Sequence, residues 1–487
     1  MHQAKSEKKN TKWISGNISK ELINTWDLFD TLLTRFYADP LDVFRMIEAK
    51  NPGFDFFRYR IEAQSLLDKI GKPYNLYDIY RKMAENGFQE ESISGFLSTE
   101  IRTEFDLMFP IRSSIEQVSE KDIIVSDMYM SDHHIEELIS QVCDLKGLRP
   151  AIRSNWGKNT GTIWPEILRH YLIRNHHGDN ERSDYESPKK YGINSILITS
   201  SKPTEWERRV DNLGQKHLAL LLREARLRGL GKDSTKIHDI FSGPYLTLLY
   251  AYSVWIFHRF SLNSQVNFVF LRRDGEDLAH IFSAMFPTCE VKQIDLTRMI
   301  SHINEPEFND ALLHQINPNS ILVDVVGTGR SPVNFLKTTR AKFKKISLMI
   351  FLDDLLNGDE IKIRNKDIDS GLFDFVIRRS QMGYSHSPLE CLLQTLCPQL
   401  ISISYDVSSG GVVRSFSKLD LSSNEAALIE DKNNLLKEFI GAIKHRGLEV
   451  CSADTAEKLM VTALIEIAQS QDIYKKFPSF IMRESNL

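Results

Sequence analysis

Four short segments, far apart in this 487-residue chain, contain the residue types that handle a phosphoryl group with a magnesium ion. In chain order they provide a carboxylate at Asp27, a hydroxyl at Ser126, an ammonium group at Lys158 and paired carboxylates at Asp179 and Asp184. A nucleophilic carboxylate, an anion-binding hydroxyl, an ammonium group and metal-binding acids together cover the charge changes of phosphoryl transfer. Each segment alone is a weak signal, but their order predicts one catalytic site that uses Mg²⁺.

The elements expected around these residues alternate between strands and helices. Short apolar segments at 22–26 and 122–125 predict strands that end next to Asp27 and Ser126, and 193–199 is a further β-rich segment. Helical periodicity is expected at 133–141 and 162–171, and again from Pro40 to about Ile115. This alternation predicts an α/β fold with a parallel sheet, in which ligands bind at the carboxyl ends of the strands.

A second α/β unit is expected in the C-terminal half. Apolar strands are predicted at 266–271, 320–326 and 346–352, and the chain beyond about Asn424 has a helical pattern. The charged stretch 205–228 is interpreted as the last helix and linker of the first domain. The expected organisation is a flexible tail at 1–18, a first domain at 19–235 with a helical insert at about 38–118, a second domain at 236–420 and a helical segment at 421–487.

Composition indicates an ordinary globular protein and narrows the partners. The chain is 42% hydrophobic and 26% charged, and its net charge of −4 gives no general attraction to nucleic acid. Its five scattered cysteines predict buried thiols in a reducing compartment. Gly243 and Pro244 interrupt the most apolar stretch, 240–260, which favours a buried helix over a membrane span. The cytoplasm is therefore the expected location, whereas the oligomeric state stays open.

Residues 19–225 resemble the haloacid dehalogenase-like (HAD) hydrolase superfamily. Asp27 stands at the position of the family's nucleophile, with Thr31 four residues later, and Ser126 and Lys158 match its second and third motifs. Asp179 and Asp184 match the fourth motif. The resemblance implies a Rossmann-like core with a helical cap, bound Mg²⁺ held by Asp27, Asp179 and Asp184, an aspartyl-enzyme intermediate, and a substrate contact for Thr31.

One position departs from the phosphatases of that superfamily. They generally have a second aspartate two residues after the nucleophile as general acid and base, whereas this chain has Phe29 there. General acid–base catalysis typically contributes about 10²–10⁴-fold in rate. Within the superfamily, the segments 26–35 and 126–131 resemble a group of bacterial two-domain proteins in which phenylalanine is usual at this position.

The segment from Ile321 to Ser331 has the form of a strand followed by a small-residue loop before a helix. Backbone N–H groups in such a loop can bind a phosphate at a helix N-terminus. Residues 240–355 resemble type I phosphoribosyltransferases, with one acid where those enzymes usually have two. The candidate substrate-binding residues are Asp324, Thr328, Gly329, Arg330 and Ser331, together with Arg273 and Asp274 of an upstream turn.

These observations predict an Mg²⁺-dependent HAD-type phosphohydrolase fused to a phosphoribosyltransferase-like domain. The substrate class is a small phosphorylated metabolite, either a sugar phosphate or a nucleotide. Two alternatives stay open: a sensor or scaffold that binds phosphorylated metabolites without chemistry, and an active phosphoribosyltransferase.

Overall fold

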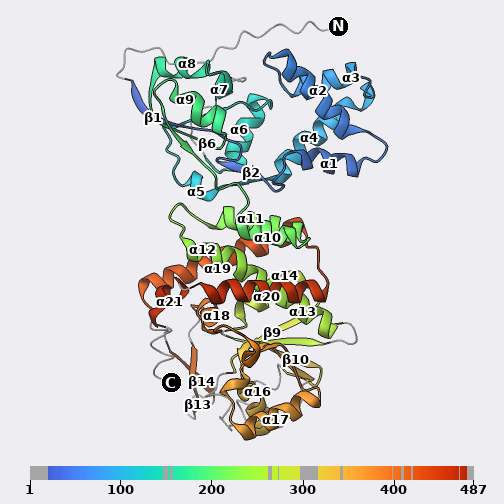
Figure 1. Cartoon of the computed structure of the whole chain (residues 1–487), viewed down its shortest axis with the longest axis vertical. Coiled ribbons are helices and arrows are strands. Elements are labelled where there is room, and N and C mark those ends of the chain that lie inside the picture. Colours follow the sequence, from blue (N-terminus) through green and yellow to red (C-terminus); the bar gives the residue numbers. More distant parts are fainter. Residues whose placement is uncertain are drawn as a thin grey trace. The chain divides into compact units, whose positions relative to one another are not determined.

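The protein has an α/β fold that divides into two compact units, Met1–Lys202 (unit 1) and Pro203–Leu487 (unit 2). Figure 1 shows unit 1 in blue to green and unit 2 in green to red. The structure is a computed structural model, and it describes residues 20–145, 152–153, 157–261, 266–272, 274–296, 316–339, 344–396, 399–406, 411–417, 421–470 and 472–479. The predicted tail at 1–18 lies outside the described residues.

Unit 1 is built on a five-stranded parallel sheet with the order β5-β4-β1-β6-β7. The direction in which successive strands are added reverses between β1 and β6, which makes their carboxyl ends the expected ligand-binding crevice. The strands are β1 (Glu21–Trp26), β4 (Ile123–Ser126), β5 (Ile152–Arg153), β6 (Tyr171–Gly178) and β7 (Asn194–Leu197). The core helices are α6 (Asp132–Gln141), α7 (Gly157–Thr160), α8 (Ile163–His170), η2 (Glu181–Glu186) and α9 (Ser187–Lys189).

A helical insert, here called the cap, lies between β1 and β4, as the sequence predicts for residues 38–118. Its antiparallel strands β2 and β3 stand at the two ends of the insert, and Figure 1 shows its helices α1–α4 gathered as a separate group in unit 1. Buried ion pairs fix it internally: Arg60 contacts Glu100 at 2.9 Å, and Arg35 contacts Glu104 at 2.7 Å. Its elements are β2 (Leu33–Arg35), α1 (Leu41–Lys50), α2 (Phe56–Ile70), α3 (Leu76–Glu85), η1 (Glu90–Ser92), α4 (Ile93–Leu107), β3 (Met108–Pro110) and α5 (Arg112–Ile115).

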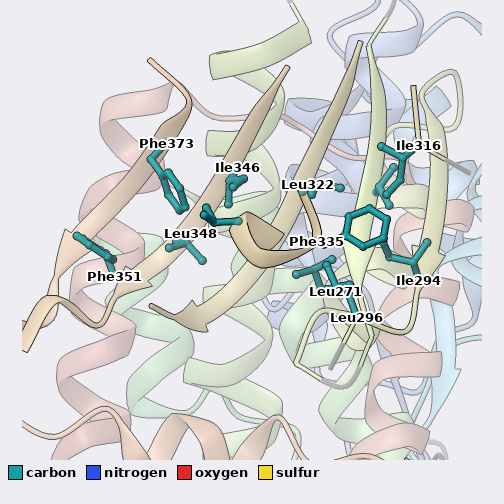
Figure 2. Close-up of a cluster of buried hydrophobic side chains, with 12 residues drawn as sticks. Leu271, Ile294, Leu296, Ile316, Leu322, Phe335, Ile346, Leu348, Phe351 and Phe373 are labelled. Carbon is teal, nitrogen blue, oxygen red and sulfur yellow. The ribbon is translucent and has the colours of Figure 1, made fainter. Parts of the chain in front are cut away.

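Unit 2 contains a second five-stranded parallel sheet, with the order β12-β11-β10-β8-β9. Its strands are β8 (Asn267–Leu271), β9 (Glu290–Ile294), β10 (Ser320–Gly327), β11 (Lys345–Phe351) and β12 (Phe373–Arg378). Figure 2 shows the buried cluster on one face of this sheet, where Phe335 of α16 (Arg330–Thr339) lies over Leu271 and Leu322. Strand order reverses between β8 and β10, so both sheets have a crevice of the same kind.

Helices pack around the second sheet, and unit 2 begins earlier in the chain than the sequence analysis expects. α11 packs against α19, and α13 packs against α14 and α20. The stretch 205–228 therefore belongs to unit 2. The boundary expected near residue 235 and the separate segment expected at 421–487 both fall inside that unit.

The remaining elements of unit 2 are α10 (Glu205–Asn212), α11 (Lys216–Gly229), α12 (Lys236–Ile240), η3 (Phe241–Tyr245), α13 (Leu246–Phe260), α14 (Glu276–Met285), η6 (Asp353–Leu355), α17 (Gly358–Asp369), η7 (Arg379–Gln381), α18 (Ser387–Leu392), β13 (Gln399–Asp406), β14 (Gly411–Ser417), α19 (Ser423–Arg446), α20 (Ala453–Gln469) and α21 (Asp472–Lys476).

The most apolar stretch of the chain forms a helix in the interior of unit 2. In the part of the chain that the structure describes, Lys236–Phe260 is the one helical stretch long and apolar enough to cross a membrane, and 89% of its most apolar window is buried within the protein. A buried helix is what the sequence predicts here. The cysteines that fall within the described residues are free thiols, with Cys143, Cys391 and Cys451 buried; Cys397 lies outside those residues.

Candidate active site

Asp27 directly follows β1, at the point where strand order in unit 1 reverses. Its backbone N–H donates to the carbonyl oxygen of His177 at 2.8 Å, which extends the pairing of β1 with β6 by one residue. The preceding Trp26 stacks on the His177 ring at 3.8 Å and donates its indole N–H to the buried Asp122 carboxylate at 3.1 Å. These contacts fix the end of β1, and the Asp27 side chain is 8% exposed.

Lys158 provides the central cation of the site. Its ammonium group donates to Oδ1 of Asp27 and, at 2.8 Å, to Oδ1 of Asp184, and the residue is buried. The lysine backbone is held on both sides, because Asp127 accepts its N–H at 3.3 Å and the Ser187 hydroxyl donates to its carbonyl oxygen at 2.6 Å. The structure therefore joins the first, third and fourth sequence motifs through direct contacts.

Asp184 is placed by η2, the turn that follows β6. Its Oδ2 accepts the backbone N–H of Asn180 at 3.1 Å, and its Oδ1 lies 3.2 Å from Nε2 of His176. Gly178 is required beneath it, because an added Cβ would lie 2.4 Å from the Asp184 Cβ. His176 also contacts the Thr25 hydroxyl at 2.9 Å through Nδ1. The fully buried His176 thus connects β1 to the acid, a role that the sequence analysis did not assign.

The remaining predicted residues of this site divide into two kinds. Ser126, at the end of β4, and Asp179, after β6, line the same cavity as Asp27, Lys158 and Asp184. Thr31 is fully buried, is not among the described residues that line the cavity, and donates to Oδ2 of Asp27 at 3.3 Å. The structure therefore supports a positioning role for Thr31, and the predicted substrate contact stays a prediction.

The cavity has a volume of about 400 Å³ and is closed on one side by the cap. Gln64 and Asp68 of α2, with Tyr74 of the following loop, line it opposite the residues of the sheet edge. The backbone N–H of Leu76, at the start of α3, donates to the carbonyl oxygen of Tyr129 at 2.9 Å, so the cap is hydrogen-bonded to the loop after β4. The sequence analysis did not identify these three cap residues as part of a site.

Burial and charge set the ionisation of the acids. Burial raises the pKa of the Asp27 carboxyl to about 8. Lys158 lowers this pKa, whereas the negative charges of Asp184 and Asp179 raise it further. Burial, with Asp30 and Asp184 nearby, raises the pKa of Asp179 to about 7. Burial alone would also raise the pKa of Asp184, but Lys158 and His176 hold it well below its usual value. Of the two carboxyls that contact the Lys158 ammonium group, Asp184 is thus the one that stays fully ionised.

The donor set is suited to a hard divalent cation. Carboxylate oxygens of Asp27, Asp179 and Asp184 lie within 4.8 Å of one another. Mg²⁺ prefers oxygen ligands in a compact arrangement and commonly retains several waters, so a few carboxylates lining one cavity satisfy it. A positive ion at this place would also compensate the acids whose pKa values burial raises. The residues present therefore fit a hard divalent cation, the class to which Mg²⁺ belongs.

The two residues after Leu28, Phe29 and Asp30, both line the cavity but differ in how their side chains are held. Phe29 lines the cavity, and the Arg35 guanidinium lies 5.3 Å from the centre of its ring. Asp30 has a φ of +58°, a backbone conformation that favours glycine, and its carboxylate accepts the Thr34 hydroxyl. Asp30 also lines the cavity, but Thr34 holds its side chain, so it does not simply replace the missing acid.

The predicted residues of unit 2 that the structure describes lie near the carboxyl ends of β8 and β10, and several are already engaged. Arg330 forms a two-point ion pair with Glu360 of α17, at 2.9 and 2.6 Å. Asp324 accepts the N–H of Val325 at 2.9 Å, and the Thr328 hydroxyl accepts that of Arg330 at 3.3 Å.

Three further candidates of unit 2 differ in what the structure shows. Gly329 has a φ of +67°, and a Cβ there would lie 2.4 Å from the Phe373 ring, which explains the glycine. Asp274 is buried after β8, and Ser331 is half-buried in the first turn of α16. Arg273 lies outside the described residues. The expected phosphate contacts in this unit therefore stay predictions.

A scan against models of protein families gives no match for this chain, and a search of curated proteins gives none. The functional interpretation therefore depends on the residues themselves and on the geometry of the cavity.

Proposed function

We propose that unit 1 is an Mg²⁺-dependent phosphohydrolase of the HAD type, acting on a small phosphorylated metabolite through an aspartyl-phosphate. The single observation that carries this proposal is the buried Lys158 ammonium group, which contacts both Asp27 and Asp184 in a cavity also lined by Ser126 and Asp179. A nucleophile, an anion-binding hydroxyl, a cation and metal-binding acids thus share one space at the reversal point of the sheet.

The proposed reaction has two displacements at phosphorus. An Asp27 carboxylate oxygen attacks the phosphoryl group, a bond from phosphorus to that oxygen forms, and the bond from phosphorus to the leaving oxygen breaks. The leaving oxygen takes its proton from solvent water, because Phe29 provides none, and the proton lost by the attacking water in the second step restores the balance. Water then attacks the same phosphorus, which releases inorganic phosphate and regenerates the Asp27 carboxylate. Lys158 and Ser126 hold the phosphoryl oxygens during both steps. Mg²⁺ held by Asp27, Asp179 and Asp184 would neutralise charge on the phosphoryl group.

Phosphate release from a panel of small phosphomonoesters with Mg²⁺ tests the proposal. We expect release that a chelator stops and that Asp27→Asn abolishes, because the amide removes the nucleophile while it keeps nearly the same shape. Asp359→Asn, at an exposed position of α17 in unit 2, is the matched control and should leave release unchanged. Release that persists in Asp27→Asn would remove Asp27 from the mechanism.

A binding module without turnover is the second candidate, and Phe29 is the observation that favours it. Phe29 occupies the cavity wall beside Asp27 and cannot transfer a proton to the leaving alcohol. Calorimetry distinguishes the two candidates, since tight binding of a phosphomonoester with no phosphate release supports the module. Phe29→Asp is the informative variant, because a gain of phosphate release would show that the rest of the machinery is competent.

We also propose that unit 2 has a phosphoribosyltransferase-like fold. The glycine-containing loop at 327–331 lies where strand order reverses, which supports a phosphate-binding role. The Arg330–Glu360 ion pair and the single Asp324 count against transferase activity. Release of pyrophosphate from phosphoribosyl pyrophosphate tests the activity directly, and binding of that compound without release would leave unit 2 as a ligand-binding domain.

A further inference from the structure

The charge of the cavity in unit 1 is strongly one-sided. Its lining includes six aspartates, Asp27, Asp30, Asp68, Asp127, Asp179 and Asp184. Among the described side chains that line it, Lys158 is the one cation, and its ammonium group is already shared by two of these acids. One lysine together with one divalent cation leaves these acids in excess, so among the described side chains that line the cavity no further positive charge faces the rest of a bound substrate.

The two ends of the cavity have different roles. Under the proposed function, the phosphoryl group lies beside Asp27, Ser126 and Lys158, and the alcohol part of the substrate points toward the cap. The cap side presents Asp68 and Tyr74, whose hydroxyl donates to Oδ1 of Asp68 at 2.5 Å. That hydrogen bond orients the Asp68 carboxylate and leaves its second oxygen as an acceptor.

We infer that the substrate is a phosphomonoester whose alcohol part carries hydroxyl or amino groups and no second anionic group. This inference rests on the proposed function of the same site, and it assigns Asp68 as the residue that discriminates. A hydroxyl or ammonium group can donate to the Asp68 carboxylate, whereas a carboxylate or second phosphate would meet like charge. Bisphosphates and phosphorylated sugar acids are thereby disfavoured.

Three hexose derivatives of similar size provide the test: glucosamine 6-phosphate, glucose 6-phosphate and 6-phosphogluconate, each titrated calorimetrically with Mg²⁺ present. We expect 6-phosphogluconate to bind at least about tenfold more weakly than glucose 6-phosphate, a factor equivalent to about 1.4 kcal/mol. The difference should be larger at low salt than at high salt, because Asp68 is exposed and its charge is screened. Equal affinities in the wild-type protein would overturn the inference.

Variants at the cap then test the assignment of the residue. Asp68→Lys should bring the affinities of 6-phosphogluconate and glucose 6-phosphate together or reverse their order, and Asp68→Asn should lie between. The control is Glu62→Gln on the same helix, where the side chain pairs with Arg58 on the exposed surface and should not change the ratio. A ratio that Asp68→Lys leaves unchanged would overturn the assignment.

The outcome that removes the proposed function is different and can be recognised. In that case none of the three esters binds in the presence of Mg²⁺, and none releases phosphate. That result would refute the inference about substrate charge together with the proposed function. Unequal binding of the three esters without phosphate release would support the inference and refute only the proposed phosphohydrolase activity.

Discussion

Replacing Lys158 by methionine tests the electrostatic core of the site. The ammonium group is buried between Asp27 and Asp184, with 3% of the side chain exposed. Removing one partner of a buried ion pair typically costs about 3–5 kcal/mol, because the remaining charge is left uncompensated. Protonation limits the loss: neutralising one carboxyl at pH 7 costs about 4 kcal/mol, since the ordinary aspartate pKa lies about three pH units lower. We therefore expect unit 1 to lose about 3–4 kcal/mol of unfolding free energy at pH 7.

The pH dependence gives this prediction a sign. The depressed pKa of Asp184 contributes stability that is present above its ordinary value, near pH 4, and is lost as the pH falls. In Lys158→Met, burial raises the pKa of Asp184 instead, and protonating this carboxyl costs more free energy as the pH rises from 4 to 7. The destabilisation should therefore be largest near pH 7 and shrink toward pH 4. Adding Asp184→Asn to Lys158→Met should recover most of the loss, because the uncompensated charge is then gone.

Hydrogen exchange of the β1 and β6 amides measures this loss separately for unit 1, which matters because a two-unit chain need not unfold in one step. Lys82→Met is the matched control, since Lys82 pairs with Glu85 on the surface of α3 and should change stability by less than about 0.5 kcal/mol. A loss below about 1 kcal/mol for Lys158→Met would refute the argument that this lysine compensates a buried charge.

Two further predictions concern the metal-binding acids. Gly178→Ala places a Cβ 2.4 Å from that of Asp184, so we expect weaker Mg²⁺ binding by calorimetry and a loss of stability of about 1–3 kcal/mol; Gly95→Ala, in α4 with open space around it, should cost nothing. Unchanged Mg²⁺ affinity in Gly178→Ala would contradict the placement of Asp184. In metal-free buffer the raised pKa values of Asp27 and Asp179, about 8 and 7, mean that protons compete with the metal. Mg²⁺ affinity should therefore rise from pH 6 to pH 8 with proton release, which calorimetry in buffers of different ionisation enthalpy detects, and a flat profile would refute it.

Asp27 and Ser126 could be predicted from the sequence because each lies at the end of a short apolar strand. Parallel strands bring their carboxyl ends to one edge, so local patterns alone indicate that Asp27 and Ser126 share a site. Asp179 is predicted from the order of the motifs and not from a preceding apolar strand. The contribution of His176 could not be predicted in the same way. Residues 171–178 read as polar, and β6 is recognised only once its pairing with β1 is known.

The cap residues and the domain boundary required tertiary structure. The sequence shows which face of α2 is apolar, but not that Asp68 on another face would line the cavity. The charged stretch 205–228 is interpreted from the sequence as the last helix and linker of the first domain, whereas several of its charges are buried in pairs within unit 2. Arg226 contacts Glu207 at 2.7 Å, and Arg446 of α19 contacts Glu224 at 3.0 Å. Paired charges of this kind cannot be distinguished from surface charges by composition.

Anomalous diffraction from a crystal grown with Mn²⁺ tests the central claim most directly, because Mn²⁺ accepts the same carboxylate ligands as Mg²⁺. The geometry predicts a single strong peak bounded by the carboxylates of Asp27, Asp179 and Asp184, beside the ammonium group of Lys158. A saturated crystal with no peak in that cavity, or with its ion bound by other residues, would contradict the proposal that these side chains form a metal-dependent phosphoryl-transfer site.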